Sequence, residues 1–306
     1  MIKLRGTFLD EITHDIPAQN WGIDEWDADF AAMKAVGIDT VILIRAGYKQ
    51  HATFSSKVLK KEMNIFPVYE DQVQIFLDLA LKHNMRFFFG LYDSGKYWMN
   101  KDYASEIKIN KDFCDEVIQR YGSHPAFQGW YFSHEIGKYE SGVMKVYREM
   151  ASHLKKLKPM PILISPYVHG VKQFVVDKIS FDDHVKQWRK IFTEIGDVID
   201  YVAFQDGQVA YEELKDYLQA HKGLADEFGI ESWSNVESFD RDIPWKFPPL
   251  RFRDLRMKME MAASAGVENL ITFEFSHFMS PNSIYPGAHG LYKKYKAWMD
   301  EQIALK

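Results

Sequence analysis

The sequence contains one cysteine, Cys114, among its 306 residues. A single cysteine cannot close a disulfide within the chain or build a cysteine-rich zinc site, so the core must stabilise the fold. No run of about 18 apolar residues is present that would span a membrane, and the first residues lack the apolar segment of an export signal. As written, the chain is expected to be cytoplasmic; it would be exported if such a signal had been removed.

Positive charge is not in excess either, because 38 Lys and Arg residues face 43 Asp and Glu residues, for a net charge of −5. This balance argues against nucleic acid as a partner. The G-x-G-x-x-G, Walker, G-x-S-x-G and H-E-x-x-H motifs are all absent, so no nucleotide cofactor, serine nucleophile or zinc site is predicted. Aromatic residues, in contrast, make up 15% of the chain. Such an excess is typical of a bulky core or of a cleft for a ligand.

Short apolar runs rich in Val, Ile and Phe alternate with longer segments of helical period, which is the pattern of repeated βα units. Eight such units follow one another at intervals of about 38 residues, a spacing that suits a strand, a helix and two loops. The predicted strands are Leu4–Leu9, Thr40–Ile44, Arg86–Leu91, Phe127–Ser133, Ile162–Ser165, Tyr201–Gln205, Ile230–Val236 and Leu270–Phe275.

Helical runs between the strands end at glycines, where a left-handed residue closes a helix. These glycines are Gly37, Gly122, Gly196, Gly229 and Gly266. No linker or low-complexity stretch interrupts the chain, so residues 1–306 are predicted to form a single (β/α)8 barrel. The longest segments without helical period, 47–66, 94–110 and 277–290 among them, follow strands and should therefore lie on the face where barrels carry their sites.

Carboxylates are concentrated where the predicted strands end, and Arg45 ends the second strand. Clustered carboxylates repel one another, so their convergence on one rim favours a function over a purely structural use. The seven acids are Asp10, Glu11, Asp93, Glu135, Asp206, Glu237 and Glu274.

The most specific segment is 124–135, His-Pro-Ala-Phe-Gln-Gly-Trp-Tyr-Phe-Ser-His-Glu. It resembles the fourth strand of the clan of retaining glycoside hydrolases with barrel folds, and the opening residues 6–10 are similar to a bacterial group of uncharacterised barrels assigned provisionally to the glycosidases. The resemblance implies that Glu135 is the acid/base and that Glu237, at the end of the seventh strand, is the nucleophile. It also implies an arginine at the position of Arg45.

The segment departs from the clan at two places. His134 stands where the clan usually has an asparagine that binds the sugar 2-hydroxyl, and an imidazole can make a similar hydrogen bond. On the eighth strand, Glu274 lies between two phenylalanines where the clan commonly has a tryptophan. Glu274 therefore stays open as an alternative to Glu237 for the second carboxylate.

Substrate-binding residues are expected at strand ends and in the loops that follow, because sugar sites combine aromatic faces with a few hydrogen-bonding groups. The candidates are Asp10, Arg45, Trp98, Trp130, His134, Gln205, Asp206, Trp233, Asn235 and Glu274, with Trp21, Trp245 and Tyr285 as further rim aromatics.

The sequence thus predicts a glycosidase that cleaves a carbohydrate substrate with two carboxylates and without metal or cofactor. Three alternatives stay open. One is a divalent-metal sugar isomerase with Glu135, Asp206, Glu274 and a histidine as ligands, the histidines near strand ends being His14, His51, His134, His169 and His277. The others are a carbohydrate-binding barrel without catalysis, and transglycosylation with the same residues. The sugar and the oligomeric state are left open.

Overall fold

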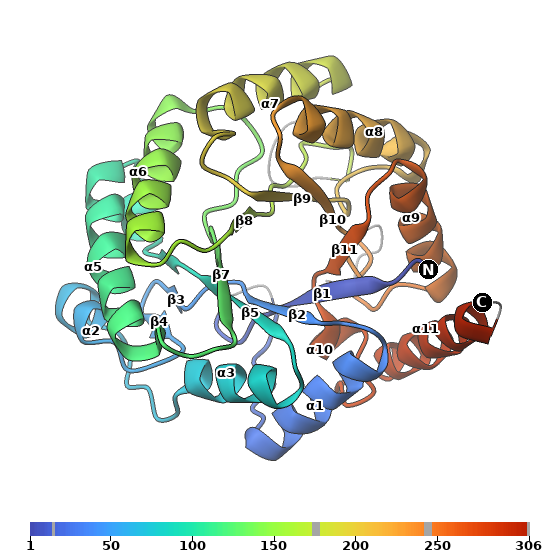
Figure 1. The fold of residues 1–306 in the computed structure, drawn as a ribbon, viewed down its shortest axis with the longest axis horizontal. Helices are drawn as coiled ribbons and strands as arrows, with labels where there is room; N and C mark the ends of the chain where they lie inside the picture. Colours follow the sequence, from blue (N-terminus) through green and yellow to red (C-terminus); the bar gives the residue numbers. More distant parts are fainter. Residues whose placement is uncertain (14–15, 173–177, 242–246, 305–306) are drawn as a thin grey trace.

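The computed structural model describes residues 1–13, 16–172, 178–241 and 247–304. Eight parallel strands close into a barrel, in which every strand is hydrogen-bonded to two neighbours (Figure 1). In order around the barrel they are β1 (Leu4–Leu9), β11 (Asn269–Thr272), β10 (Glu231–Asn235), β9 (Tyr201–Gln205), β8 (Ile162–Ile164), β7 (Phe127–Tyr131), β5 (Arg86–Gly90) and β2 (Thr40–Leu43). The predicted (β/α)8 barrel is confirmed.

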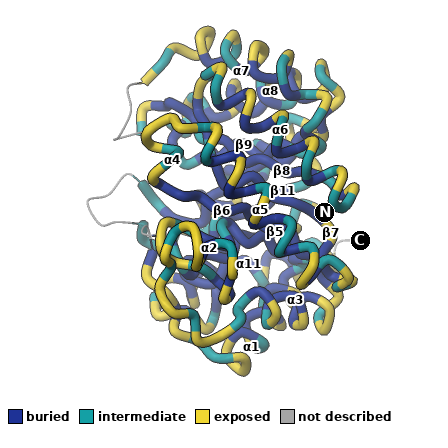
Figure 2. Tube along the Cα trace, turned by 90° about the vertical axis from the view of Figure 1, so that its left-hand side faces the viewer, coloured by how far each residue is buried: buried dark blue, intermediate teal, exposed yellow. Residues whose placement is uncertain are grey.

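Helices form a ring around the strands, and Figure 2 shows that the strands are buried while the helices expose their outer faces. Each helix of this ring follows one strand of the barrel, as βα units require. The helices are α1 (Ile23–Ala35), α3 (Gln72–Lys82), α5 (Tyr103–Tyr121), α6 (Ser141–Leu157), α7 (Phe181–Ile195), α8 (Tyr211–Glu227), α9 (Phe252–Ser264) and α11 (Pro286–Ala304). Within the described ranges, none combines the length and the apolar composition of a membrane span.

Strand side chains alternate between the barrel interior and the layer under the helices, because successive residues of a strand point to opposite faces. The interior holds a small apolar cluster that includes Phe8, Tyr131 and Trp233. The larger apolar cluster, which includes Trp130 on β7, packs between strands and helices. Space inside is tight: a Cβ on Gly129 would lie 2.1 Å from the Phe88 ring.

The loops that follow the strands contain short elements that the sequence pattern did not predict. They are α2 (Lys57–Met63), α4 (Lys96–Met99), α10 (Phe275–Phe278) and a three-stranded sheet of β4 (His51–Ala52), β3 (Gly47–Tyr48) and β6 (Tyr92–Asp93). The prediction that 94–110 is non-helical was wrong, since α5 begins at Tyr103. Its N-cap, Asp102, accepts a hydrogen bond from the Ser105 amide, a start signal upstream of the apolar period.

Helix ends at glycine were predicted in the right places, but only partly for the right reason. Gly37, Gly229 and Gly266 have positive φ, as a left-handed cap requires. Gly122 and Gly196 instead stay in the right-handed region, and each amide bonds a carbonyl four residues earlier. These two glycines therefore continue their helices by one residue.

Candidate active site

Glu135 lies four residues beyond Tyr131, the last residue of β7, at the mouth of the barrel, and its side chain is half-buried. The Tyr131 hydroxyl donates a hydrogen bond of 2.9 Å to Oε1 of Glu135. Burial raises the pKa of Glu135; the charge of Arg45 opposes this effect, and the like charge of Glu237 adds to it. A carboxyl group of this kind retains its proton to higher pH than an ordinary glutamic acid, which suits a general acid.

Arg45, which follows β2, supplies positive charge beside Glu135. Its Nε lies 3.6 Å from Oδ2 of Asp93, and its Nη1 lies 3.4 Å from the Thr13 hydroxyl. The carboxylates of Glu135, Asp93 and Asp10 all interact with its charge. Arg45 therefore offsets part of the repulsion that the acidic rim creates.

Glu237 lies two residues beyond the end of β10 and is only 1% exposed. The guanidinium of Arg241 donates two hydrogen bonds of 2.8 Å, one to each carboxylate oxygen of Glu237. The other side of the carboxylate faces Gly207, where a Cβ would lie 1.6 Å from Oε2. The orientation of the Glu237 carboxylate is therefore fixed by a two-pronged ion pair and by the absence of a side chain at Gly207.

Asp206 and Lys258 form hydrogen bonds to the main chain of Glu237. Oδ1 of Asp206 accepts a 3.0 Å hydrogen bond from the Glu237 amide, and Lys258 donates a 2.8 Å bond to the Glu237 carbonyl. The two side chains form an ion pair of 2.7 Å, and both are buried. Burial raises the pKa of Asp206 to about 6, although Lys258 opposes the rise. Asp206 was predicted to bind substrate, but its Oδ1 accepts a hydrogen bond from the Glu237 amide and forms an ion pair with Lys258.

Two buried amides lie next to the carboxylates, on β9 and β10. Gln205 donates a 3.0 Å bond to the Ser165 carbonyl, and its side chain also bonds Glu135. Asn235 donates a 3.1 Å bond to the Ser165 hydroxyl, and its Oδ1 has no hydrogen-bond partner among the described residues. Both predicted residues thus line the inner side of the site, and Gln205 contacts the proposed acid directly.

His134, which was predicted to bind substrate, has its side chain engaged by Glu106. It is 3% exposed, and its Nε2 lies 2.7 Å from Oε1 of Glu106 on α5. The Trp98 ring packs against it, with the ring centroids 4.6 Å apart. The imidazole is thus enclosed between Glu106 on α5 and Trp98 on α4.

One group of residues in the described part of the chain has the spacing of metal ligands: Asp93, Glu106 and His134, whose ligand atoms all lie within 4.8 Å of one another. Glu106 already accepts hydrogen bonds from His134, from Asn110 and from the Ser94 amide and hydroxyl. Arg45 also faces Asp93. These donors and the nearby guanidinium satisfy the carboxylates, so the group fits a closed hydrogen-bond network better than a cation site.

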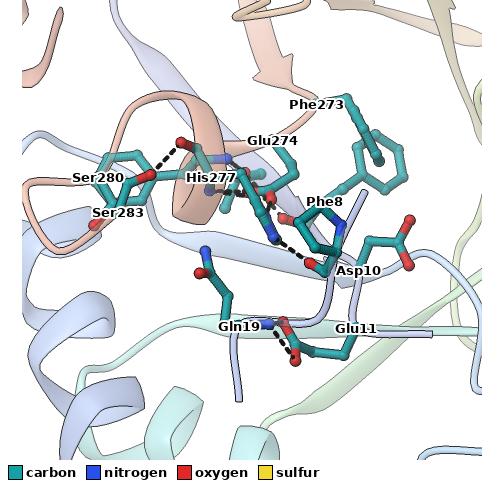
Figure 3. Close-up of polar contacts among 12 residues, drawn as sticks. Phe8, Asp10, Glu11, Gln19, Phe273, Glu274, His277, Ser280 and Ser283 are labelled. Carbon is teal, nitrogen blue, oxygen red and sulfur yellow. Dashed lines mark hydrogen bonds and ion pairs between the residues drawn. The ribbon is translucent and has the colours of Figure 1, made fainter. Parts of the chain in front are cut away.

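Glu274 is fully buried and acts as the N-cap of α10 (Figure 3). Both of its oxygens accept from the His277 amide, and it forms an ion pair with the His277 ring. Burial disfavours the charged imidazole, but Glu274, the Pro17 carbonyl and Glu11 together outweigh burial and raise the pKa of His277 to about 9. Glu274 was predicted as a substrate contact or second carboxylate; the structure instead commits it to the start of a helix.

Asp10 and Glu11 extend the same acidic side of the mouth, after β1. Asp10 is 3% exposed, and its Oδ1 accepts a 3.0 Å hydrogen bond from the Thr13 amide. Both oxygens of Glu11 accept from the Gln19 amide (Figure 3), and burial raises the pKa of Glu11 to about 7. These carboxylates brace the first loop, and Asp10 also lies within reach of the charge of Arg45.

Two of the predicted indole contacts were wrong. Trp130 is fully buried under the helices, because it alternates with Tyr131, which points inward. Trp233 points into the barrel near the strand starts, where it stacks on Tyr201 and lines a hollow with Arg5 and Arg86. Trp98 is half-buried and packs against His134, the residue before Glu135 in the sequence. The predictions for His14 and Trp245 lie outside the described residues.

Sequence reasoning missed the groups that orient the two glutamates. Tyr131 stood inside the segment that was singled out, and a spacing of four residues from Glu135 could have drawn attention to it. Arg241 stands four residues after Glu237 in the same way. Lys258 gave no signal of this kind, because it reaches the site from the middle of a helix that reads as amphipathic.

Residues 4–285 match the model of a family described as a domain of unknown function, DUF4434. A Bacteroides thetaiotaomicron protein that has been provisionally named an alpha-L-fucosidase has a crystal structure with 47% sequence identity and a TM-score of 0.94. The match covers 98% of this chain and 94% of that one.

More distant structures share the fold. An endo-1,4-beta-D-mannanase from Thermotoga petrophila has 14% identity and a TM-score of 0.64, over 96% of this chain and 99% of that one. A beta-galacturonidase from Eisenbergiella tayi has 12% identity and a TM-score of 0.59, over 97% of this chain and 51% of that one. The structures similar to this chain are thus glycoside hydrolase barrels. No curated protein matches its sequence.

Proposed function

The chain belongs to the DUF4434 family, and we propose that it is a retaining glycoside hydrolase with Glu135 as acid/base and Glu237 as nucleophile. One observation carries the proposal. Glu135 stands at the barrel mouth with its pKa raised by burial, and Glu237, three strands away around the barrel, is near enough for its charge to act on Glu135. Two carboxyl groups in unlike surroundings are what glycoside cleavage requires.

The chemistry follows from the different surroundings of the two groups. Glu135 gives its proton to the glycosidic oxygen while the carboxylate of Glu237 attacks the anomeric carbon, so the bond to the leaving group breaks as the glycosyl ester forms. Water then attacks the same carbon, Glu135 takes the proton of that water, and the ester bond to Glu237 breaks. Arg241 and Arg45 offset the negative charge of the two groups during this cycle.

The substrate class is tested first with terminal sugars. An alpha-L-fucoside is the first substrate to try, because the 47% identical relative carries the provisional name of an alpha-L-fucosidase. The wild-type protein is incubated with nitrophenyl glycosides of fucose, galactose, mannose, xylose and uronic acids. Proton NMR of the first sugar released shows whether the anomeric configuration is retained.

Variants then separate the two roles. We expect Glu135→Ala to keep activity on nitrophenyl leaving groups, which need little protonation, and to lose it on sugar leaving groups. Glu237→Ala should lose turnover on both, and azide should restore it with formation of a glycosyl azide. Glu274→Gln is the matched control, because this acid lies at the same mouth but caps α10. Full activity of Glu237→Ala would refute the assignment.

A further inference from the structure

Glu237, the residue proposed as nucleophile, is bonded at its main chain as well as at its side chain. The two groups that bond its main chain, Asp206 and Lys258, are charged and buried. Asp206 comes from the loop after β9, Lys258 comes from α9, and Glu237 follows β10. Three separate elements thus meet at the two peptide groups that flank the Cα atom of Glu237. We propose that the Asp206–Lys258 ion pair is a positioning device for Glu237, which it holds through its N–H and its C=O.

Asp206 and Lys258 bond the two main-chain polar groups of Glu237. A carboxylate oxygen of Asp206 takes the Glu237 amide at 3.0 Å, and the ammonium group of Lys258 donates to the Glu237 carbonyl at 2.8 Å. Because the two side chains also pair with each other at 2.7 Å, neither can move without moving the other. The N–H and C=O of Glu237 are therefore both bonded by this ion pair, while the amides of Val236 and Ser238 on either side bond the carbonyls of Ile271 and Phe273.

Both charges of the Asp206–Lys258 pair are buried. Lys258 is 3% exposed and Asp206 is 5% exposed, so both charges have been taken out of water. A buried ion pair is often no better for stability than apolar side chains of the same volume, and in some proteins such a pair fixes one arrangement. Here both partners bond the main chain of Glu237, whose two carboxylate oxygens are also bound by Arg241.

The proposal rests on the proposed role of Glu237, and the test therefore includes an arm that needs no activity. The test variant is the double substitution Lys258→Met with Asp206→Asn, which removes both charges and the bond to the Glu237 carbonyl but keeps an acceptor for the Glu237 amide. Lys258→Arg is the conservative variant, which retains the charge. These proteins are compared with the wild type in melting temperature, kcat, KM and amide hydrogen exchange.

The control is a more exposed Lys–Asp ion pair at the other end of the barrel, which also bonds a main-chain amide. Lys155 pairs with Asp200 at 2.7 Å, and Asp200 accepts from the Ile162 amide at the start of β8. Lys155→Met with Asp200→Asn removes that pair far from the mouth. It should change the melting temperature and leave kcat unchanged, because nothing at the start of β8 touches Glu135 or Glu237.

For the test variant we expect kcat to fall by about a hundredfold with KM within about threefold, since a misplacement of about 1 Å is enough to cost that much. Lys258→Arg should recover part of kcat. Exchange of the peptide that contains Glu237 should become at least about tenfold faster, as expected when local anchoring is lost. Wild-type kcat in the double variant, or a loss no larger than that of the control, would overturn the proposal.

The exchange arm separates this inference from the proposed function. If the wild type cleaves no glycoside, the proposed function fails, and faster exchange at Glu237 in the double variant still supports a positioning role. If exchange at Glu237 is unchanged while the wild type is an active glycosidase, the proposed function stands and the positioning role is refuted.

Discussion

Substitution of Gly207 by alanine gives a direct test of whether Glu237 works where the structure places it. A Cβ at this position would lie 1.6 Å from Oε2 of Glu237, 2.5 Å from its Cδ and 2.8 Å from Nε of Arg241. Atoms at Cβ do not approach others below 3.0 Å, so the carboxylate would have to retreat by about 1.4 Å. Gly207 is not among the glycines with positive φ, so alanine meets no backbone strain there, and the clash is with the Glu237 carboxylate and with the guanidinium of Arg241 that binds it.

The magnitude follows from this displacement. A misplacement of about 1 Å costs roughly a hundredfold in rate, so Gly207→Ala should lower kcat/KM by at least about a hundredfold on whichever glycoside the wild type cleaves. Overpacking of this kind also costs about 1 to 3 kcal/mol of stability. The free energy of unfolding is measured in urea beside the kinetics, so that loss of folded protein is not mistaken for loss of catalysis.

Gly223→Ala is the control, because a Cβ there meets nothing within 4 Å and the residue lies inside α8. Alanine in a helix interior is favoured over glycine by about 1 kcal/mol, so this variant should be slightly more stable and fully active. If Gly207→Ala keeps kcat/KM within about threefold of the wild type, the carboxylate of Glu237 is not used in the position described, and the reasoning fails.

Two further outcomes are expected. Tyr131→Phe removes the 2.9 Å hydrogen bond to Glu135, a bond that lowers the pKa of this carboxyl group. Because a hydrogen bond to a charged group is worth about 1.5 kcal/mol, the basic limb of the pH profile of kcat/KM should move up by about one pH unit. An unmoved limb would show that the Tyr131 hydroxyl does not act on Glu135. His184 and His221 form a buried pair 2.8 Å apart behind β9, and burial lowers the pKa of His184 to about 4. Such a histidine stays neutral in the folded protein and binds a proton in the unfolded chain below about pH 6.5. The free energy of unfolding is therefore highest above that pH and falls towards pH 4, by about 2 kcal/mol per histidine between pH 7 and pH 5. Urea unfolding at the two pH values measures this loss, and the double variant His184→Phe with His221→Phe should flatten it; an equal loss in that variant would place the effect elsewhere.

Much of this protein could be predicted from local pattern. Short apolar runs alternating with helical runs give the count of βα units, and eight units without a linker predict a barrel, because each strand end must return through a helix to the next strand. The same count places Glu135, Glu237 and Arg45 beyond strand ends on one face. These inferences depend on spacing along the chain, which the sequence carries in full.

Only the tertiary structure decided which of these residues face the mouth and which are already engaged. Trp130 and Tyr131 are neighbours in sequence, yet one packs under the helices and the other reaches Glu135, because a strand sends successive side chains to opposite faces. Glu274 looked equivalent to Glu237 until its oxygens proved to cap α10. Lys258 reaches Glu237 from 21 residues further along the chain. Contacts of this kind depend on where separate elements meet in space, and local sequence patterns do not encode that.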